Sequence, residues 1–338
     1  MLRILLVAHG NMPIPPKGWG AVESLIWDYS VHLKKLGHSV HILNLHIEQV
    51  DQILDHLHNY EYDIVHFHND VLVNILHLVP KTLPVVVSSH YPYIHDPSQW
   101  ADPVTGYDYG KFVMAPLLKA VHTFGTHVIA ISQKDRDAFI SYGVPPESVS
   151  VCVNGVDTSK FELKLGRIQN PGSMICLAQI IPRKRQHLFK GLDFIKCAGK
   201  INNEAALPSQ EQFIGEWYED KYHKLTEYSG GILLSDGENG TPLGIKESLA
   251  AGLGLVVSEA VASEIPKDWP WVTVIPESKI GDREYLAGAC QKIMDLAPPL
   301  KVQIRMEAMA LWDWSALVPK YVGILEKVAQ ATAERTGL

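Results

Sequence analysis

Residues 233–252 read LLSDGENGTPLGIKESLAAG and join the end of an apolar strand to a helix through a turn of small residues. Apolar periodicity predicts the helix over Leu243–Ala251. Backbone N–H groups from Gly240 to Leu243, in the segment that includes Thr241 and Pro242, can hold a diphosphate, and the nearby Glu247 carboxylate can accept hydrogen bonds from ribose hydroxyls. A simple helix cap explains Asn239 and Thr241 but not the whole arrangement.

Short apolar, β-branched runs alternate with amphipathic segments on both sides of this stretch. The strands expected in the first half are Ile4–Ala8, Ser39–Leu43, Ile64–Phe67, Val85–Ser88, Val128–Ile131 and Val151–Val153, and those in the second half are Met174–Leu177, Phe194–Ala198, Gly231–Leu234, Leu255–Ser258 and Val272–Ile275. The expected helices include Val22–Leu36, Val50–Leu57, Leu117–Phe124, Lys134–Tyr142 and Trp314–Ala329. Continuous apolar strands separated by helices predict an α/β protein with parallel, doubly wound sheets.

A polar segment without periodicity, Asp157–Pro171, marks a domain linker. The expected organisation is a Rossmann-like domain over residues 1–160, a second one over 161–312, and a C-terminal helical segment over 313–338. Ligands of such folds bind at the carboxyl ends of the strands, so a cleft between the two domains is expected to hold the site.

The composition of the chain narrows the class of protein. Its 338 residues carry a net charge of −7, which argues against non-specific electrostatic binding to nucleic acid or anionic lipid. The four cysteines are widely spread and are expected to be buried small hydrophobes in a reducing compartment. The apolar run Ile4–Ala8 is too short to span a membrane and lacks the features of a signal peptide, so a buried first strand and a cytoplasmic location are expected.

The loop after the first strand contains Gly18, Trp19 and Gly20 and opens a helix. Glycines at that place let backbone N–H groups approach an anion, but a turn without a ligand is the commoner explanation, because glycines often join a strand to a helix. A dinucleotide fingerprint needs a third glycine where this chain has Glu23, which argues against an NAD enzyme.

Three histidines, His66, His68 and His90, lie at predicted strand ends, where a substrate would bind. The spacing of His66 and His68 is compatible with a metal, but no third ligand is evident, so both are expected to be hydrogen-bonded structural residues. The aromatic stretch from Tyr91 to Tyr109 suits either a sugar-like ligand or packing over the sheet. Arg183, Lys184 and Arg185 follow a strand and suggest a bound anion, because helix starts disfavour positive charge.

Several segments together resemble glycosyltransferase family four, whose members are retaining enzymes of the GT-B fold that use nucleotide-sugars. They occur in family order over roughly residues 1–260 and read PPKGWGAVES, YDIVHFHND, VVSSH, VIAISQKDRDAFISYGV, VNGVDTSKF, PRKRQ and GENGTPLGIKESLAAGLGLVVSE. The resemblance implies that Gly18 and Gly20 lie near the donor phosphate and the acceptor, and that His90 touches the transferred sugar. It further implies that Lys184 contacts the diphosphate and that Glu247 binds the donor ribose. The C-terminal helix, within 313–338, resembles the family element that crosses back onto the first domain.

The chain departs from the family pattern at two positions. Gln179 stands where the family usually has an arginine, and Asn239 stands at the first glutamate of the E-x7-E pair, with Glu238 one residue earlier. Arg183 and Glu238 are candidates to take over by local shifts. Residues 192–212 show little strand and helix pattern, which predicts an abbreviated C-terminal domain.

The resemblance implies a retaining transfer in which the leaving diphosphate accepts the proton of the acceptor hydroxyl. The protein then needs neither a metal nor a cofactor, and its partners are a nucleotide-sugar and a carbohydrate or other hydroxyl acceptor. The acidic charge and the lack of a basic amphipathic helix give no support to membrane contact. Two alternatives remain: a degenerate sugar-nucleotide-binding protein and a nucleotide-sugar epimerase.

Overall fold

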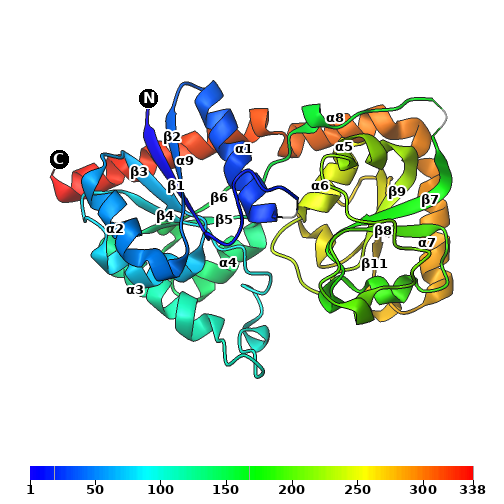
Figure 1. The fold of residues 1–338 in the computed structure, drawn as a ribbon, viewed down its shortest axis with the longest axis horizontal. Coiled ribbons are helices and arrows are strands. Elements are labelled where there is room, and N and C mark those ends of the chain that lie inside the picture. The colour runs from blue at the N-terminus through cyan, green and yellow to red at the C-terminus, as the bar shows by residue number, and fades with distance from the viewer. Residues whose placement is uncertain (19, 167, 338) are drawn as a thin grey trace. The chain divides into compact units, whose positions relative to one another are not determined.

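The computed structural model describes residues 1–18, 20–166 and 168–337 and divides the chain into two compact units. Unit 1 comprises Met1–Asn154 together with Trp314–Leu338, of which Leu338 is not described, and unit 2 comprises Gly155–Asp313. Each unit is built on one sheet of parallel strands with helices packed against it (Figure 1). This is the α/β, doubly wound architecture that the sequence predicts.

Unit 1 contains a six-stranded sheet in the order β2-β1-β3-β4-β5-β6. Its strands are β1 Arg3–Ala8, β2 Ser39–Asn44, β3 Ile64–Phe67, β4 Val85–Val87, β5 His127–Ala130 and β6 Val149–Val151. Its α-helices are α1 Ala21–Lys35, α2 Val50–Asn59, α3 Ala115–Phe124, α4 Gln133–Ser141 and α9 Trp314–Thr336. The predicted strands agree with these bounds to within about two residues, because uninterrupted apolar runs are the local signature of buried parallel strands.

Side chains of unit 1 alternate between the two faces of its sheet. Val65 and Phe67 of β3 join a buried cluster with residues of α2 and α3, whereas His66 between them points to the opposite face. There the His66 ring is hydrogen-bonded to Tyr321 of α9. The C-terminal helix therefore packs on the same face as α1, and Asp28 of α1 accepts a hydrogen bond from the Trp314 indole at 3.3 Å.

Unit 2 contains a five-stranded sheet in the order β11-β10-β9-β7-β8. Its strands are β7 Asn170–Leu177, β8 Ile195–Ala198, β9 Tyr228–Leu233, β10 Gly254–Ser258 and β11 Val272–Ile275. Its α-helices are α5 Lys221–Lys224, α6 Leu243–Ala250, α7 Arg283–Leu296 and α8 Lys301–Trp312. Between β8 and β9 the described chain forms a single four-residue α-helix, α5, which agrees with the weak pattern of that region.

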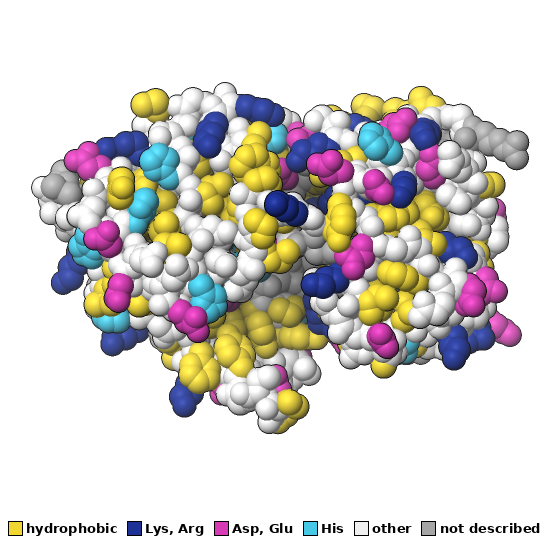
Figure 2. Space-filling view, viewed as in Figure 1, with side chains coloured by type: hydrophobic (Ala, Val, Ile, Leu, Met, Phe, Trp, Pro, Cys, Tyr) yellow, Lys and Arg dark blue, Asp and Glu magenta, His cyan; other side chains and the backbone are white. Residues whose placement is uncertain are grey.

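The surface and the cysteines agree with the composition. On the face shown in Figure 2, cationic and anionic side chains alternate and do not gather into one basic patch. All four cysteines are buried and free of disulfides. Among the described helices, none has a stretch that is both long and apolar enough to cross a bilayer.

Candidate functional site

The strand order of unit 2 places its candidate residues at one point of the sheet. The chain passes from β7 to β8 on one side and then to β9 on the other, so β7 and β9 are neighbours at the topological switch point. Open parallel sheets bind ligands outside the carboxyl ends of the strands at such a point. Lys184 follows β7 and Glu238 follows β9, so both lie there.

Two cations of the segment after β7 converge on one carboxylate after β9. The Lys184 ammonium forms an ion pair with Glu238 Oε1, and Arg183 Nη1 lies 3.0 Å from the same oxygen. Arg183 also donates to the carbonyl oxygen of Gly237, and its own carbonyl accepts a hydrogen bond of 3.0 Å from the Asp236 N–H. These contacts fasten the basic segment to the loop that leads into α6.

Burial and charge oppose each other within this pair. Burial lowers the pKa of Lys184, and the neighbouring Glu238 offsets this only in part. Burial alone would raise the pKa of Glu238, but Lys184 and Arg183 outweigh it and hold that pKa below its usual value. Glu238 is therefore an anion at neutral pH, and it serves as the internal counter-ion of two residues predicted to meet a diphosphate.

The start of α6 is open to an acceptor of hydrogen bonds. Pro242 is the N-cap residue and no described side chain caps the helix, so Asn239 and Thr241 do not serve as the cap that the sequence allowed. Thr241 is 3% exposed, and its Oγ1 has no hydrogen-bond partner in the described structure. Gly244 lets the helix approach β7, because a Cβ there would lie 2.4 Å from the carbonyl oxygen of Leu177.

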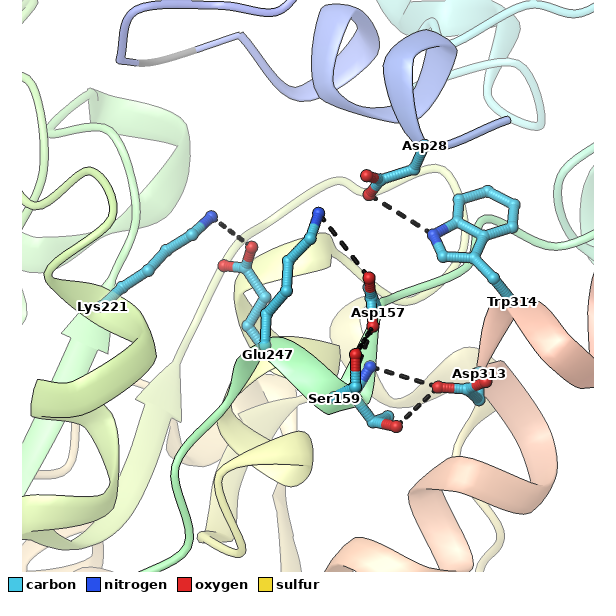
Figure 3. Close-up of polar contacts among 9 residues, drawn as sticks. Asp28, Asp157, Ser159, Lys221, Glu247, Asp313 and Trp314 are labelled. Carbon is cyan, nitrogen blue, oxygen red and sulfur yellow. Dashed lines mark hydrogen bonds and ion pairs between the residues drawn. The ribbon is translucent and has the colours of Figure 1, made fainter. Parts of the chain in front are cut away.

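Glu247 lies on α6 and is paired with a cation from α5. The Lys221 ammonium contacts Glu247 Oε1, and Figure 3 shows the two side chains pointing toward each other. Their side chains are 22% and 13% exposed, so a ligand can reach the pair. Sequence reasoning missed Lys221 because a lysine in a polar segment carries no local signal; only the fold brings it next to Glu247, 26 positions away.

The sheet of unit 1 also has a topological switch point. Its chain passes from β1 to β2 on one side and to β3 on the other, so the switch point lies between β1 and β3. His68 follows β3 and His90 follows β4, the next strand, and their rings stack at a centroid distance of 5.9 Å. Burial, with an added contribution from His9, lowers the pKa of His90 to about 4.

The loop before α1 is described only in part. Gly20 is the N-cap residue of α1 and has a φ of 153°, a conformation that favours glycine. Gly18 lies two residues earlier, whereas Trp19 falls outside the described residues.

The expectation that His66 and His68 are both hydrogen-bonded is correct for only one of them. His66 contacts the Tyr321 hydroxyl at 2.7 Å through Nδ1 and the Ser88 hydroxyl at 2.9 Å through Nε2. His68 is 2% exposed, yet neither of its ring nitrogens has a hydrogen-bond partner among the residues that the structure describes. Among the described residues, no group of three or more histidine, cysteine or acidic side chains is arranged to hold a metal ion.

The aromatic stretch packs onto the core of unit 1. Tyr91 stacks on the fully buried Tyr109 at a centroid distance of 4.2 Å, and Trp100 meets the same ring edge-on at 5.6 Å. The Trp100 indole donates to the carbonyl oxygen of Tyr93 at 2.9 Å. Of the two explanations that the sequence left open, packing accounts for these rings.

Comparison with known proteins gives one consistent result. Residues 43–160 match the model of Glycosyltransferase Family 4. The chain is 21% identical over 303 residues to an MMP α-(1→4)-mannosyltransferase of Mycolicibacterium hassiacum, a match that covers 81% of this chain and 72% of the relative. The matched segment of this chain is thus similar to glycosyltransferase family 4, as the resemblance in sequence indicated.

Solved structures of glycosyltransferases share the fold of this chain. Anabaena HepE, solved in complex with UDP and glucose, superposes with a TM-score of 0.68 at 16% identity over 100% of both chains. Sucrose-phosphate synthase of Thermosynechococcus elongatus gives a TM-score of 0.75 at 11% identity, over 97% of this chain and 100% of that one. The fold is therefore GT-B, as the resemblance in sequence implied.

The two departures from the family 4 pattern have different structural surroundings. Glu238 contacts both Arg183 and Lys184, so the glutamate that lies one residue early is engaged with the basic segment. Gln179 offers its backbone carbonyl to the Gln186 amide at 2.6 Å, which fixes the turn after β7. Where the family usually has an arginine, this chain has Gln179. Arg183 instead lies next to Lys184 and contacts the same Glu238 oxygen.

Proposed function

We propose that this chain is a retaining glycosyltransferase that moves a sugar from a nucleotide-sugar to an acceptor hydroxyl. The observation that carries the proposal is the fastening of Arg183 and Lys184 to the loop that opens α6, at the switch point of the unit 2 sheet. Cations and free helical N–H groups at one point suit a diphosphate. HepE, a relative in fold, was solved with UDP-glucose, which favours the same class of donor.

In the proposed reaction, the bond between the anomeric carbon and the diphosphate oxygen breaks, and a bond to the acceptor oxygen forms on the same face. The proton of the acceptor hydroxyl passes to the leaving diphosphate. Lys184, Arg183 and the first N–H groups of α6 stabilise the charge that develops on that leaving group. Glu247 holds the ribose and His90 orients the sugar, so the proposed reaction needs neither a metal nor a cofactor.

A panel of nucleotide-sugars tests the proposal. The purified protein is incubated with UDP-, GDP- and ADP-sugars, with and without simple glycosides, in buffer containing EDTA. Release of free nucleotide together with a glycoside of retained anomeric configuration, seen by NMR, is the expected result. A product of inverted configuration or a requirement for added divalent metal contradicts the corresponding part of the proposal.

A second candidate is a binding protein without catalysis, which the internal ion pairs favour. Both Lys184 and Glu247 already have partners of opposite charge, so a ligand has to displace or share them. A nucleotide-sugar that raises the melting temperature without being consumed supports this candidate. An epimerised donor without transfer supports instead a nucleotide-sugar epimerase.

A further inference from the structure

His68 is the buried polar side chain of unit 1 that most needs an explanation. It is 2% exposed, and both Nδ1 and Nε2 are buried without a hydrogen-bond partner in the described structure. A buried polar group left without a partner costs about 1–3 kcal/mol of stability. Such groups are uncommon in folded proteins, and a ligand that supplies the missing partner is one reason for keeping them.

The neighbouring His66 shows that a histidine at the end of β3 can have hydrogen-bond partners for both ring nitrogens. The centroids of the His66 and His68 rings lie 3.9 Å apart. Both rings contact the ring of Tyr29 on the same face of the sheet. Both nitrogens of His66 are nevertheless bonded, to Tyr321 and to Ser88. Of these two histidines, only His68, which lies beyond the end of β3, is without a hydrogen-bond partner in the described structure.

The unpartnered nitrogens around His68 come from three strand ends. His9 follows β1 and His90 follows β4, and in each the Nε2 atom is buried without a partner in the described part of the chain. The ring of His90 stacks on that of His68 with an angle of 14° between their planes. Because β1 and β3 flank the switch point of the sheet, these atoms lie where an open α/β sheet binds its ligand.

The protonation of these rings indicates the chemistry of the missing partner. Burial, with an added contribution from the nearby histidines, holds the pKa of His68 well below its usual value, and burial likewise lowers that of His90. A neutral imidazole offers one N–H donor and one bare acceptor nitrogen. Hydroxyl groups match that pairing because each both donates and accepts, whereas an anion needs donors and positive charge. The buried carboxylate of Asp70, which interacts with His9, further disfavours an anion.

We propose that His9, His68 and His90 form a hydroxyl-binding subsite in which His68 directly contacts a sugar. The inference rests on the proposed function, and it adds His9 and His68 to the residues that contact substrate. The hydroxyls belong either to the transferred sugar or to a carbohydrate acceptor, which present the same chemistry. Kinetics that vary donor and acceptor separately distinguish these two sources.

The test uses the full-length protein with His68→Phe, His68→Gln and, as a matched control, His66→Phe. His68→Phe keeps an aromatic ring in the stack and removes two unpartnered nitrogens, so its melting temperature is expected to equal or exceed that of the wild type. His66→Phe strips Tyr321 and Ser88 of a partner and is expected to melt lower. A structural role for His68 predicts the same loss for both phenylalanine variants.

Activity provides the second readout, with the nucleotide-sugar that the wild type consumes and the methyl glycoside that accepts its sugar. His68→Phe is expected to lower kcat/KM at least about 10-fold, and His68→Gln is expected to recover part of it because an amide also donates and accepts. A rise in the donor KM, seen also as slower donor hydrolysis without acceptor, assigns the hydroxyls to the transferred sugar. A rise in the acceptor KM alone assigns them to the acceptor.

Unchanged kinetics in His68→Phe overturn the inference, whatever the melting temperature of that variant. If the wild type consumes no donor, the proposed function fails, and binding of methyl glycosides measured by saturation-transfer NMR still tests the subsite. Signals present in the wild type and lost in His68→Phe then support the subsite. Absence of signals in the wild type, or equal signals in both proteins, overturns it.

Discussion

Lys184 and Glu238 form an ion pair in which both side chains are about nine-tenths buried, with exposed fractions of 10% and 9%. The pair joins the segments that follow β7 and β9 at the switch point of the sheet. Burying two charges is costly unless they are paired and further bonded. Here Arg183 provides the additional contact to the same carboxylate, so removal of Lys184 does not leave Glu238 without a cation.

Lys184→Ala is expected to lower turnover at least about 100-fold, because a group that stabilises charge on the leaving diphosphate contributes most in the transition state. Release of nucleotide from the preferred donor measures the effect. Lys196→Ala, which removes a half-buried lysine of β8 whose ammonium donates to the Glu211 carbonyl at 3.4 Å, is the matched control. Near-normal turnover of Lys184→Ala removes this residue from the mechanism.

Glu247→Gln is expected to weaken binding of the nucleotide-sugar about 10-fold or more. A hydrogen bond to a charged acceptor contributes about 1.5–3 kcal/mol, and the amide removes that charge. Isothermal titration calorimetry with the donor and with the free nucleoside diphosphate measures the loss. Because Lys221 is 22% exposed, the variant leaves it hydrated and the fold intact. Equal affinities for wild type and variant contradict a ribose-binding role.

Gly244→Ala is expected to destabilise unit 2 by about 1–3 kcal/mol, because the added methyl group would clash with a backbone carbonyl rather than with a movable side chain. The Cβ would lie 2.4 Å from the Leu177 oxygen. Gly288→Ala in α7 is the matched control, since a Cβ there meets nothing within 4 Å. That variant is expected to gain about 0.4–1 kcal/mol. Urea unfolding measures both, and the same sign for the two variants contradicts the close approach.

The protein is expected to lose stability as the pH falls from 6.5 toward 4. Burial lowers the pKa of His127 in β5 to about 4. Between pH 6.5 and 4, this histidine therefore binds a proton in the unfolded chain but stays neutral in the folded one. The free energy of unfolding therefore falls by about 3 kcal/mol for this residue over that range. His66, with a pKa of about 3 caused by burial, adds to the loss.

His127→Gln isolates the contribution of that histidine to the pH dependence. Urea unfolding at pH 6.5, 5.5 and 4.5 is expected to show a shallower decline for this variant than for the wild type. His58→Gln, on the exposed end of α2, is expected to follow the wild-type curve. Parallel curves for the wild type and His127→Gln would show that His127 takes up its proton equally in both states.

Strand positions were predictable because their signal is local. The apolar runs at Ile64–Phe67 and Val272–Ile275 coincide with β3 and β11 to the residue. Helices α7 and α8 were not predicted. In α8, exposed apolar residues such as Val302 and Met306 blur the pattern. Periodicity fails where a helix does not confine its apolar side chains to one face.

The positions of the candidate residues near strand and helix ends were predictable from the sequence, but the side chains that pair with them were not. The sequence indicated that Lys184, Glu238 and Glu247 lie near strand and helix ends. It did not indicate that Glu238 pairs with Lys184 or that Lys221 pairs with Glu247. Those ion pairs join residues 54 and 26 positions apart, so they depend on how separate segments meet in the fold. His66 and His68 looked equivalent in sequence, and only packing distinguished them.

The amino-acid order alone determined that the chain forms parallel α/β sheets, because the apolar period of each segment is a property of consecutive residues. The tertiary structure decided which polar groups are satisfied. His66 gains a partner 255 positions away on α9, and the buried His68 gains none within residues 1–18, 20–166 and 168–337. Hydrogen bonds and ion pairs act over a few ångströms, so their formation depends on which distant segments the folded chain brings together.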